Sequence, residues 1–190
     1  MTKARRMNGG DVLSILFDRK WSMPNSKTFK IKPIRDLIQE ELVEGVIIDP
    51  FANEGSIKGL MSENQTYISN DIDKQYKTDY HLDALEFLKQ FEDNSVDMVL
   101  YDPPYSPRQV SEVYKKLGKT VNMQTTQASY WGNQKKEISR IIKKGGKVIT
   151  FGWKSGGIGK RNGFEIKRIL LVPHGGWHND TICTVEVKTH

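Results

Sequence analysis

The sequence predicts an α/β protein built on a doubly wound, mostly parallel β-sheet. Short apolar runs alternate along the chain with amphipathic segments, which is the order of strands and crossover helices. Three of these runs lead into an acidic residue, namely Asp49, Asp71 and Asp102. Ligands bind beyond the carboxyl ends of the strands in such sheets, so the three acids are expected to meet at one ligand-binding edge.

The expected elements alternate along the chain. Strands are expected at residues 46–49, 66–69, 96–101, 147–151, 164–172 and 181–188. Helices are expected at residues 34–43, 84–88, 107–117 and 125–143. Pro33 stands where a first-turn proline is tolerated, Asp83 is a good N-cap, and Gly145-Gly146 is expected to end the last helix. The loop 173–180 is too short for a parallel crossover, so one strand near the C-terminus should be antiparallel.

The composition is that of one globular domain. The 190 residues are 37% hydrophobic and 27% charged, and no repeat or linker divides them, so residues 1–190 are expected to form a single domain. The apolar runs are too short to cross a bilayer, and no signal core follows the basic N-terminus, so a cytoplasmic protein is expected. Cys183 is the only cysteine, which leaves no disulfide framework. The net charge of +6 permits a nucleic-acid partner, and a monomer or homodimer is expected.

The segment 49–56 has the features of a cofactor site at a strand-to-helix turn. Small residues at Ala52 and Gly55 let a ligand lie against the backbone. The sequence contains no G-x-G-x-x-G motif and no lysine of a phosphate-binding loop, which argues against dinucleotides and nucleoside triphosphates. Taken alone, the segment is also compatible with an ordinary turn. The predicted cofactor contacts here are Asp49, Pro50, Phe51, Ala52, Gly55 and Ser56.

Two further segments carry acids that suit a nucleoside. Asp71 can accept both hydroxyls of a ribose, although Asp73 can do so instead or cap a turn. Asp83 suits a hydrogen bond to the exocyclic amine of an adenine ring, with plain helix capping as the alternative. The predicted cofactor contacts in these segments are Asn70, Asp71, Ile72, Asp83 and Ala84.

The residues 49–56, Asp-Pro-Phe-Ala-Asn-Glu-Gly-Ser, resemble the cofactor motif of bacterial and phage DNA amino-methyltransferases, where Asp-Pro-Phe-x-Gly-x-Gly-[Ser/Thr] is usual. Asn53 stands where the first glycine of that motif would stand, so the match departs at this position. The resemblance implies the Rossmann-like fold of class I methyltransferases and S-adenosylmethionine as the cofactor. It also implies that residues 1–33 form an N-terminal segment over the methionine end of the cofactor. The predicted contacts in that segment are Pro24, Asn25 and Ser26.

The tetrad Asp102-Pro103-Pro104-Tyr105 predicts transfer of a methyl group to a conjugated amine. The exocyclic amine of adenine is a weak nucleophile because its lone pair is delocalised into the ring. A carboxylate at Asp102 and the carbonyl of Pro103 can accept its two N–H groups and turn the lone pair toward the methyl group of the sulfonium. The prolines fix the backbone and remove amide donors, and Tyr105 offers an aromatic face for a base taken out of its stack. This chemistry does not require a raised pKa at Asp102, because the proton leaves after methyl transfer.

Over most of its length the chain is also similar to small phage and mobile-element adenine methyltransferases. The shared pattern runs from Asp-Pro-Pro-Tyr-Ser-Pro-Arg-Gln through Gly-Gly-x-x-x-x-Phe-Gly-Trp to His-Gly-Gly-x-His-Asn-Asp-Thr. This similarity implies methylation of N6 of adenine in DNA, in the cytoplasm of a bacterium or a phage-infected host. The chain lacks a separate target-recognition domain, so low or short sequence specificity is expected.

Few segments remain to contact a substrate. The predicted substrate contacts are Ser106, Arg108, Lys154, Lys160, Arg161, His174 and His178. The cations of the glycine-rich stretch 153–161 are suited to phosphate, with a solvated loop as the alternative. His174 and His178 have no partner set of acids or histidines, so no metal is expected, and substrate contact or loop packing is the interpretation.

Other functions stay open at this point. The same chemistry can act on adenine in RNA or on N4 of cytosine, and the chain can instead be a catalytically inactive nucleic-acid-binding partner. Methylation of a protein amide is disfavoured, because such enzymes more often have asparagine where Asp102 stands. Methylation of carbon 5 of cytosine needs a cysteine nucleophile, and Cys183 lies on a terminal strand. A zinc deaminase is excluded because the ligand spacing is missing.

Overall fold

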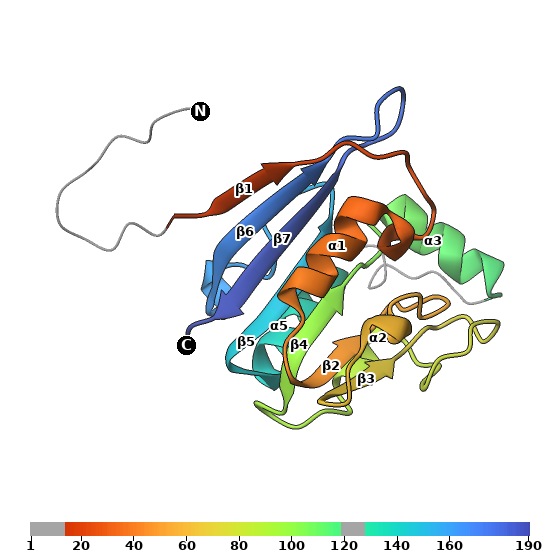
Figure 1. Cartoon of the computed structure of the whole chain (residues 1–190). Coiled ribbons are helices and arrows are strands. Elements are labelled where there is room, and N and C mark those ends of the chain that lie inside the picture. Colours follow the sequence, from red (N-terminus) through yellow and green to blue (C-terminus); the bar gives the residue numbers. More distant parts are fainter. Residues whose placement is uncertain (1–13, 119–127) are drawn as a thin grey trace.

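The computed structural model describes residues 14–118 and 128–190, which have a seven-stranded β-sheet at their centre (Figure 1). The strands are β1 (Leu16–Arg19), β2 (Gly45–Asp49), β3 (Gln65–Ser69), β4 (Val96–Tyr101), β5 (Ile142–Gly152), β6 (Phe164–Val172) and β7 (Thr181–Lys188). They are hydrogen-bonded in the order β1-β6-β7-β5-β4-β2-β3. The strand β7 is antiparallel to both neighbours, and every other pair is parallel. The predicted fold class, with one reversed strand near the C-terminus, is therefore confirmed.

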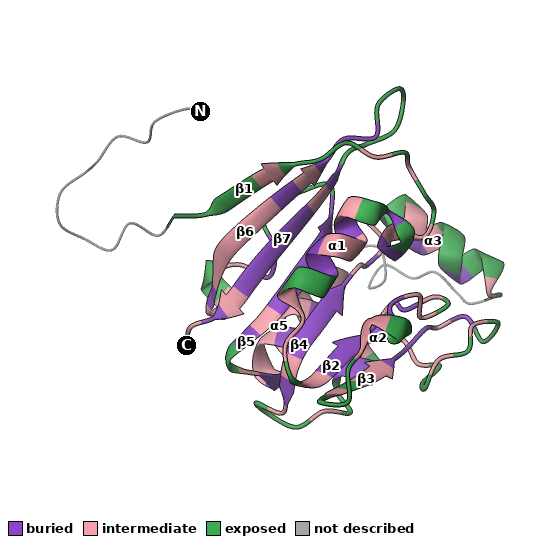
Figure 2. Cartoon of the chain, in the orientation of Figure 1, coloured by how far each residue is buried: buried purple, intermediate pink, exposed green. Residues whose placement is uncertain are grey.

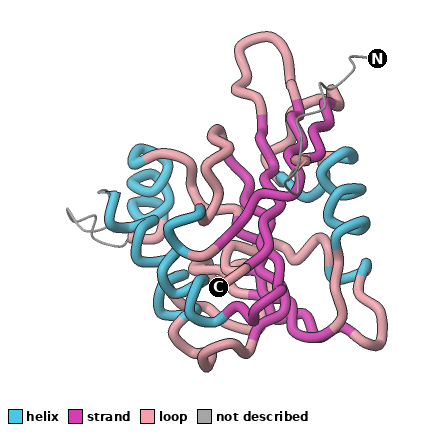
Figure 3. Tube along the Cα trace, turned by 90° about the vertical axis from the view of Figure 1, so that its left-hand side faces the viewer, coloured by secondary structure: helices cyan, strands magenta, loops and turns pink. Residues whose placement is uncertain are grey.

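Helices cover both faces of this sheet (Figure 3). The α-helices among the described residues are α1 (Lys32–Glu41), α2 (Ala84–Leu88), α3 (Pro107–Lys116) and α5 (Ala128–Ile141). Short 3-10 helices are η1 (Thr28–Lys30), η2 (Lys58–Leu60) and η3 (Lys160–Asn162). The helix α1 packs on one face of the sheet, whereas α2 and α5 pack on the other. Among the helices that the structure describes, none is long and apolar enough to pass through a bilayer.

Alternate side chains of the central strands enter two separate hydrophobic cores. Ile47 and Met98 pack with Ile34 of α1, while the next residues along the same strands, Ile48 and Val99, pack with α2 and α5. The four strand residues are fully buried, and Figure 2 shows the buried centre of the sheet. Burial on both faces explains why these strands are continuous apolar runs in the sequence.

The edge strand β1 was not predicted from the sequence. Leu16 and Phe17 are 62% and 63% exposed, so this strand lacks the apolar burial pattern that marks the others. It pairs in parallel with β6, and Asp18 forms an ion pair with Arg168. The same guanidinium also binds Glu40 of α1, which ties β1 to the rest of the fold.

The last crossover helix ends earlier than predicted. The helix α5 ends at Ile141 and β5 begins at the next residue, so Gly145 and Gly146 lie within the strand and do not cap the helix. A Cβ atom at Gly146 would lie 3.0 Å from the carbonyl oxygen of Asp97. Gly146 therefore serves the close approach of β5 to β4, whereas Gly145 has a left-handed φ of +82° and no atom near its Cβ position. The predicted helical residues 125–127 lie outside the described part of the chain.

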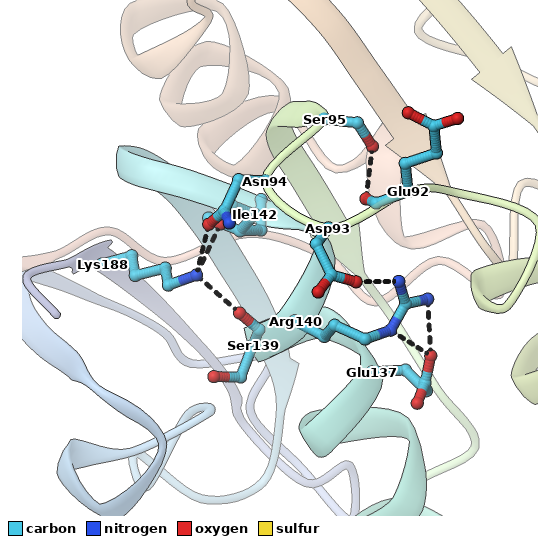
Figure 4. Close-up of polar contacts among 9 residues, drawn as sticks. All are labelled: Glu92, Asp93, Asn94, Ser95, Glu137, Ser139, Arg140, Ile142 and Lys188. Carbon is cyan, nitrogen blue, oxygen red and sulfur yellow. Dashed lines mark hydrogen bonds and ion pairs between the residues drawn. The ribbon is translucent and has the colours of Figure 1, made fainter.

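A polar cluster holds together the edge of the sheet at the amino ends of β4 and β5 (Figure 4). The Lys188 ammonium donates to Oδ1 of Asn94 at 3.1 Å and to the carbonyl oxygens of Ser139 and Ile142 at 2.8 and 2.7 Å. Burial lowers the pKa of Lys188, and the negative charge of Asp93 opposes this shift only in part. The cluster links the end of β7 to the end of α5.

Candidate active site

A cavity of about 380 Å³ opens at the carboxyl ends of β2, β3 and β4, beside α3. Small-molecule sites commonly have volumes of about 300–1,000 Å³, so the cavity is large enough for a ligand. The predicted site residues that line it are Ser26, Pro50, Phe51, Asp71, Ile72, Asp83, Ala84, Asp102, Pro103, Pro104 and Tyr105. Two of the three strand-end acids, Asp71 and Asp102, thus face one hollow.

The third strand-end acid, Asp49, does not line this cavity. Its side chain is fully buried, and its Oδ1 accepts the backbone N–H of Phe51 at 3.1 Å. Its Oδ2 accepts the hydroxyl of Tyr67 at 2.9 Å. Burial raises the pKa of Asp49 to about 8, more than these two donors lower it. Asp49 therefore stabilises the turn after β2 through its hydrogen bond with Phe51. Its position gives no direct support to the prediction that it contacts the cofactor.

The turn after β2 has left-handed backbone at the two positions where the motif that it resembles has glycine. Asn53 has a φ of +48° and Gly55 a φ of +62°, both in the left-handed region. Asparagine tolerates this region better than other side chains, so it can stand where the motif has glycine. The expected α-helix after the turn is wrong, because the segment before β3 contains only η2. Ala52 and Ser56 line a smaller hollow next to the main cavity.

The acids after β3 are held by backbone N–H groups. Asp71 accepts the N–H of Asn53 at 2.9 Å and that of Asp73 at 2.8 Å, and Asp73 accepts the N–H of Gln75 at 3.0 Å. Burial raises the pKa of Asp71 in spite of these donors. Both Asp71 and Asp73 line the cavity, and each carboxylate oxygen has a second lone pair. Asn70 is wholly buried and cross-links the turn, so it does not reach the cavity itself.

Asp83 caps α2, as the sequence predicts, and also binds a tyrosine that the sequence analysis missed. Its Oδ1 accepts the N–H of Leu85 at 3.0 Å, and its Oδ2 accepts the hydroxyl of Tyr114 from α3. Tyr114 and Gln109 line the cavity together with Thr28. The sequence pattern after the tetrad predicts the helix α3. It does not indicate which side chains of that helix point toward the cavity.

The tetrad follows β4 and forms one end of the cavity. The Tyr105 hydroxyl donates to Oδ1 of Asp102 at 2.5 Å, and Thr28 adds a second hydrogen bond to this carboxyl. Burial nevertheless raises the pKa of Asp102. The Tyr105 ring meets Trp153 edge to face, with centroids 5.5 Å apart. The hydroxyl of Tyr105 thus binds the Asp102 carboxylate, in addition to the aromatic face that its ring provides.

The backbone of the tetrad is fixed by neighbouring side chains. Trp131 donates its indole N–H to the carbonyl of Pro104 at 2.9 Å, and Gln109 accepts the N–H of Tyr105 at 2.6 Å. Among the described residues, no donor is bonded to the carbonyl of Pro103. Ser106 accepts the N–H of Gln109 and caps α3, so its hydroxyl is already engaged. A carboxylate and a carbonyl acceptor are therefore available side by side in the chain.

Several predicted substrate contacts do not reach the cavity. Arg108 is exposed and does not line the cavity, but it forms an ion pair with Glu112, which does. His174 is buried, and its ring nitrogens lie 2.9 Å from the carbonyl oxygen of Ser22 and 2.8 Å from Oγ1 of Thr181. Loop packing is thus the role of His174. The other predicted residues outside the cavity lining include Pro24, Asn25, Gly55, Ser106, Lys154 and His178.

Lys160 and Arg161 lie at the edge of the sheet opposite the tetrad, which contradicts their predicted place. They belong to η3, directly before β6, and Asn162 of this turn accepts a hydrogen bond from Ser139 near the end of α5. The physical reason is topological. Because β6 is parallel to β5, the loop between them has to return to the amino edge before β6 can begin.

No protein-family model and no curated protein matches the sequence. Comparison with solved structures nevertheless returns methyltransferases. The fold is that of class I methyltransferases.

The chain is similar to the 1,6-didemethyltoxoflavin-N1-methyltransferase of Burkholderia thailandensis, which was solved with S-adenosylhomocysteine. The TM-score is 0.57 and the identity 10%, over 84% of this chain and 78% of the other. A putative methyltransferase of Streptococcus mutans, also solved with S-adenosylhomocysteine, gives a TM-score of 0.51 and 14% identity over 83% and 96% of the two chains. For TrmN of Thermus thermophilus the TM-score is 0.54 and the sequence identity 16%, over 83% of this chain. The chain thus spans about half (49%) of the length of TrmN. At these identities the likeness concerns the fold.

Proposed function

We propose that this protein is an S-adenosylmethionine-dependent methyltransferase that acts on the N6 amine of adenine in DNA, with low or short sequence specificity. One observation carries the proposal. A single cavity is lined both by Asp102 with the diproline backbone after β4 and by the carboxylates of Asp71 and Asp73 after β3. Such a cavity can hold a nucleoside cofactor and an amine acceptor next to each other.

The lining of the cavity fits S-adenosylmethionine. Asp71 and Asp73 keep lone pairs that can accept ribose hydroxyls, while Phe51 and Ile72 supply apolar surface for a ring. The clustered acids also favour a cationic ligand. Two of the similar solved structures contain S-adenosylhomocysteine, which supports the same choice. When bound, the cofactor supplies an electrophilic methyl group on a sulfonium.

The tetrad provides the two acceptors that an exocyclic amine requires. Asp102 accepts one N–H and the Pro103 carbonyl accepts the other, so the nitrogen is drawn out of conjugation and its lone pair is aimed. The Tyr105 hydroxyl occupies one site on Asp102, and a carboxylate has further lone pairs for the amine. The buried setting strengthens each of these hydrogen bonds.

Asp102 can also take part after methyl transfer. The methylated nitrogen carries a positive charge and loses a proton readily. Because burial raises the pKa of Asp102, this carboxylate is a better proton acceptor than an exposed aspartate would be. Aspartate at this position therefore serves both as an orienting acceptor and as the first proton acceptor.

Product analysis tests the proposal. The purified protein is incubated with S-adenosylmethionine tritiated in its methyl group and with unmethylated DNA, which is then digested to nucleosides. We expect the label in N6-methyladenine. A matched DNA with hypoxanthine in place of adenine lacks the acceptor amine and should stay unlabelled. Label incorporated only when RNA replaces the DNA, or recovered only as N4-methylcytosine, would contradict the adenine-in-DNA assignment. Cofactor binding without any label would favour an inactive nucleic-acid-binding partner.

A further inference from the structure

Three tryptophan side chains are exposed at the edge of the sheet that carries the tetrad. Trp21, Trp153 and Trp177 are 60%, 40% and 103% exposed, and we call them the tryptophan row. They follow β1, β5 and β6, which run in the same direction, so all three lie beyond carboxyl ends of parallel strands. Large exposed aromatic groups gathered on one edge of a soluble domain mark an interaction surface.

Backbone contacts hold the outer part of this row together. The N–H of Lys20 donates to the carbonyl of Leu171 at 3.0 Å, and the N–H of Ser22 donates to the carbonyl of Pro173 at 3.2 Å. The segment that carries Trp21 therefore runs along the base of the loop that carries Trp177 (Figure 1). A Cβ atom built on Gly175 in that loop would lie 3.6 Å from the indole nitrogen of Trp21.

The inner part of the row touches the candidate active site. Trp153 meets Tyr105 of the tetrad, with ring centroids 5.5 Å apart. Between β1 and β4 the sheet order is β1-β6-β7-β5-β4, which is four strand spacings or roughly 19 Å at about 4.8 Å each. This length corresponds to about four to six nucleotides of a stacked strand, at a rise of about 3.4 Å per nucleotide.

The charges around the row suit a polyanion. Arg19, Lys20 and Lys154 are exposed, and none of them forms an ion pair with another residue that the structure describes. The nearby acid Asp18 is already bound by Arg168. Cations at these positions can contact phosphates, while indole faces accept any base because every base has a π-face.

We propose that Trp21, Trp153 and Trp177 form a stacking platform that binds single-stranded or locally unpaired nucleic acid and leads it to the cavity. The platform deepens the proposed function, on which it rests, by naming the form of the substrate. Its occupant is a nucleic-acid strand because exposed cations flank the row and because Trp153 contacts Tyr105 of the tetrad. Stacking is tolerant of sequence, which agrees with the low or short sequence specificity of the proposed function.

Binding of a strand that cannot be methylated tests the platform. The probe is a fluorescent twelve-nucleotide thymidine strand, since thymine has no exocyclic amine, and its anisotropy is measured without cofactor. We expect tighter binding of this strand than of an adenine–thymine duplex of the same length. Trp21→Ala and Trp177→Ala should each weaken binding about 5- to 150-fold, because stacking contributes about 1–3 kcal/mol per base and 1.4 kcal/mol is tenfold.

Conservative variants separate stacking from general hydrophobic contact. Trp177→Phe keeps an aromatic face and should retain most of the affinity, whereas Trp177→Leu should lose as much as the alanine variant. Phe17→Ala is the matched control, because Phe17 is 63% exposed on β1 but lies outside the row. The platform is overturned if Trp177→Leu and Trp177→Phe bind alike, or if the duplex binds more tightly. It is also overturned if Trp177→Ala only dissociates a dimer in light scattering and leaves strand binding unchanged.

The two proposals fail in distinguishable ways. A protein that labels adenine in DNA but binds the thymidine strand equally well without Trp21 and Trp177 overturns the platform alone. A protein that binds the strand through these residues but labels no nucleic acid overturns the proposed function alone.

Discussion

Replacing Asp49 by asparagine should make the protein more stable at alkaline pH. Its carboxyl group is fully buried, and burial raises its pKa to about 8, whereas an unfolded aspartate has a pKa of about 3.9. An acid with a raised pKa stabilises the fold fully below the unfolded pKa, and this contribution is lost as the pH rises through the folded pKa. Each pH unit between these limits costs about 1.4 kcal/mol, so Asp49 alone removes about 3–4 kcal/mol between pH 5 and pH 8.

The Asp49→Asn side chain stays neutral and can still accept the N–H of Phe51. Urea unfolding of the wild-type protein and of this variant at pH 5 and pH 8 measures the difference. We expect the free energies of unfolding to be similar at pH 5, with the variant more stable by a few kcal/mol at pH 8. Asp36→Asn, which removes a carboxylate from a surface ion pair with Lys32, should keep the wild-type pH dependence. If Asp49→Asn loses stability between the two pH values as steeply as the wild type does, the account of Asp49 is wrong.

Two further substitutions test the geometry of the site at Tyr105 and the packing of the loop between β5 and β6 at Gly157. Tyr105→Phe removes the hydroxyl that donates to Asp102, so the pKa of Asp102 should rise further and the acid limb of the kcat/KM–pH profile should move to higher pH; an unchanged profile would refute this coupling. Gly157→Ala should lower stability by about 2–4 kcal/mol in thermal unfolding, because Gly157 has a φ of +51° and the added Cβ would meet the Glu186 carboxylate. Gly156→Ala, whose Cβ meets nothing within 4 Å, should change stability little, and equal effects of the two alanines would contradict the packing argument.

The parts of the fold that the sequence predicts are those with strong burial patterns. The limits of β4, β6 and β7 agree with prediction because each is a run of apolar or alternating residues between turns. The strand β1 has no such pattern, since it lies at an exposed edge and is held by backbone pairing with β6. Pairing between segments so distant in sequence leaves no local signal.

The sequence predicts a site residue well where the role follows from the residue type alone. It predicts less well where the role depends on which other residue the side chain is hydrogen-bonded to. Asp102 and Asp71 line the cavity as expected, but Asp49 is withdrawn from it by the hydroxyl of Tyr67. This pairing joins neighbouring strands, and neither residue type requires it. Asn53 looked like a departure from the cofactor motif, yet its left-handed backbone does what glycine would do.

Lys160 shows a different limit, because only the topology places it. Its charge and its place in the glycine-rich stretch 153–161 both suited a phosphate contact. The direction of β6 decides instead that the residues directly before this strand lie at the opposite edge of the sheet.

The most direct test of the central claim is single-turnover methyl transfer by Asp102→Ala at saturating S-adenosylmethionine. Asp102 holds the acceptor amine in this account, whereas the carboxylates of Asp71 and Asp73 hold the cofactor. We therefore expect the rate of methyl transfer to fall at least about 100-fold, while calorimetry finds an affinity for S-adenosylhomocysteine close to that of the wild type. Methyl transfer at the wild-type rate by a variant that binds the cofactor normally would contradict the assignment of the tetrad as the catalytic site.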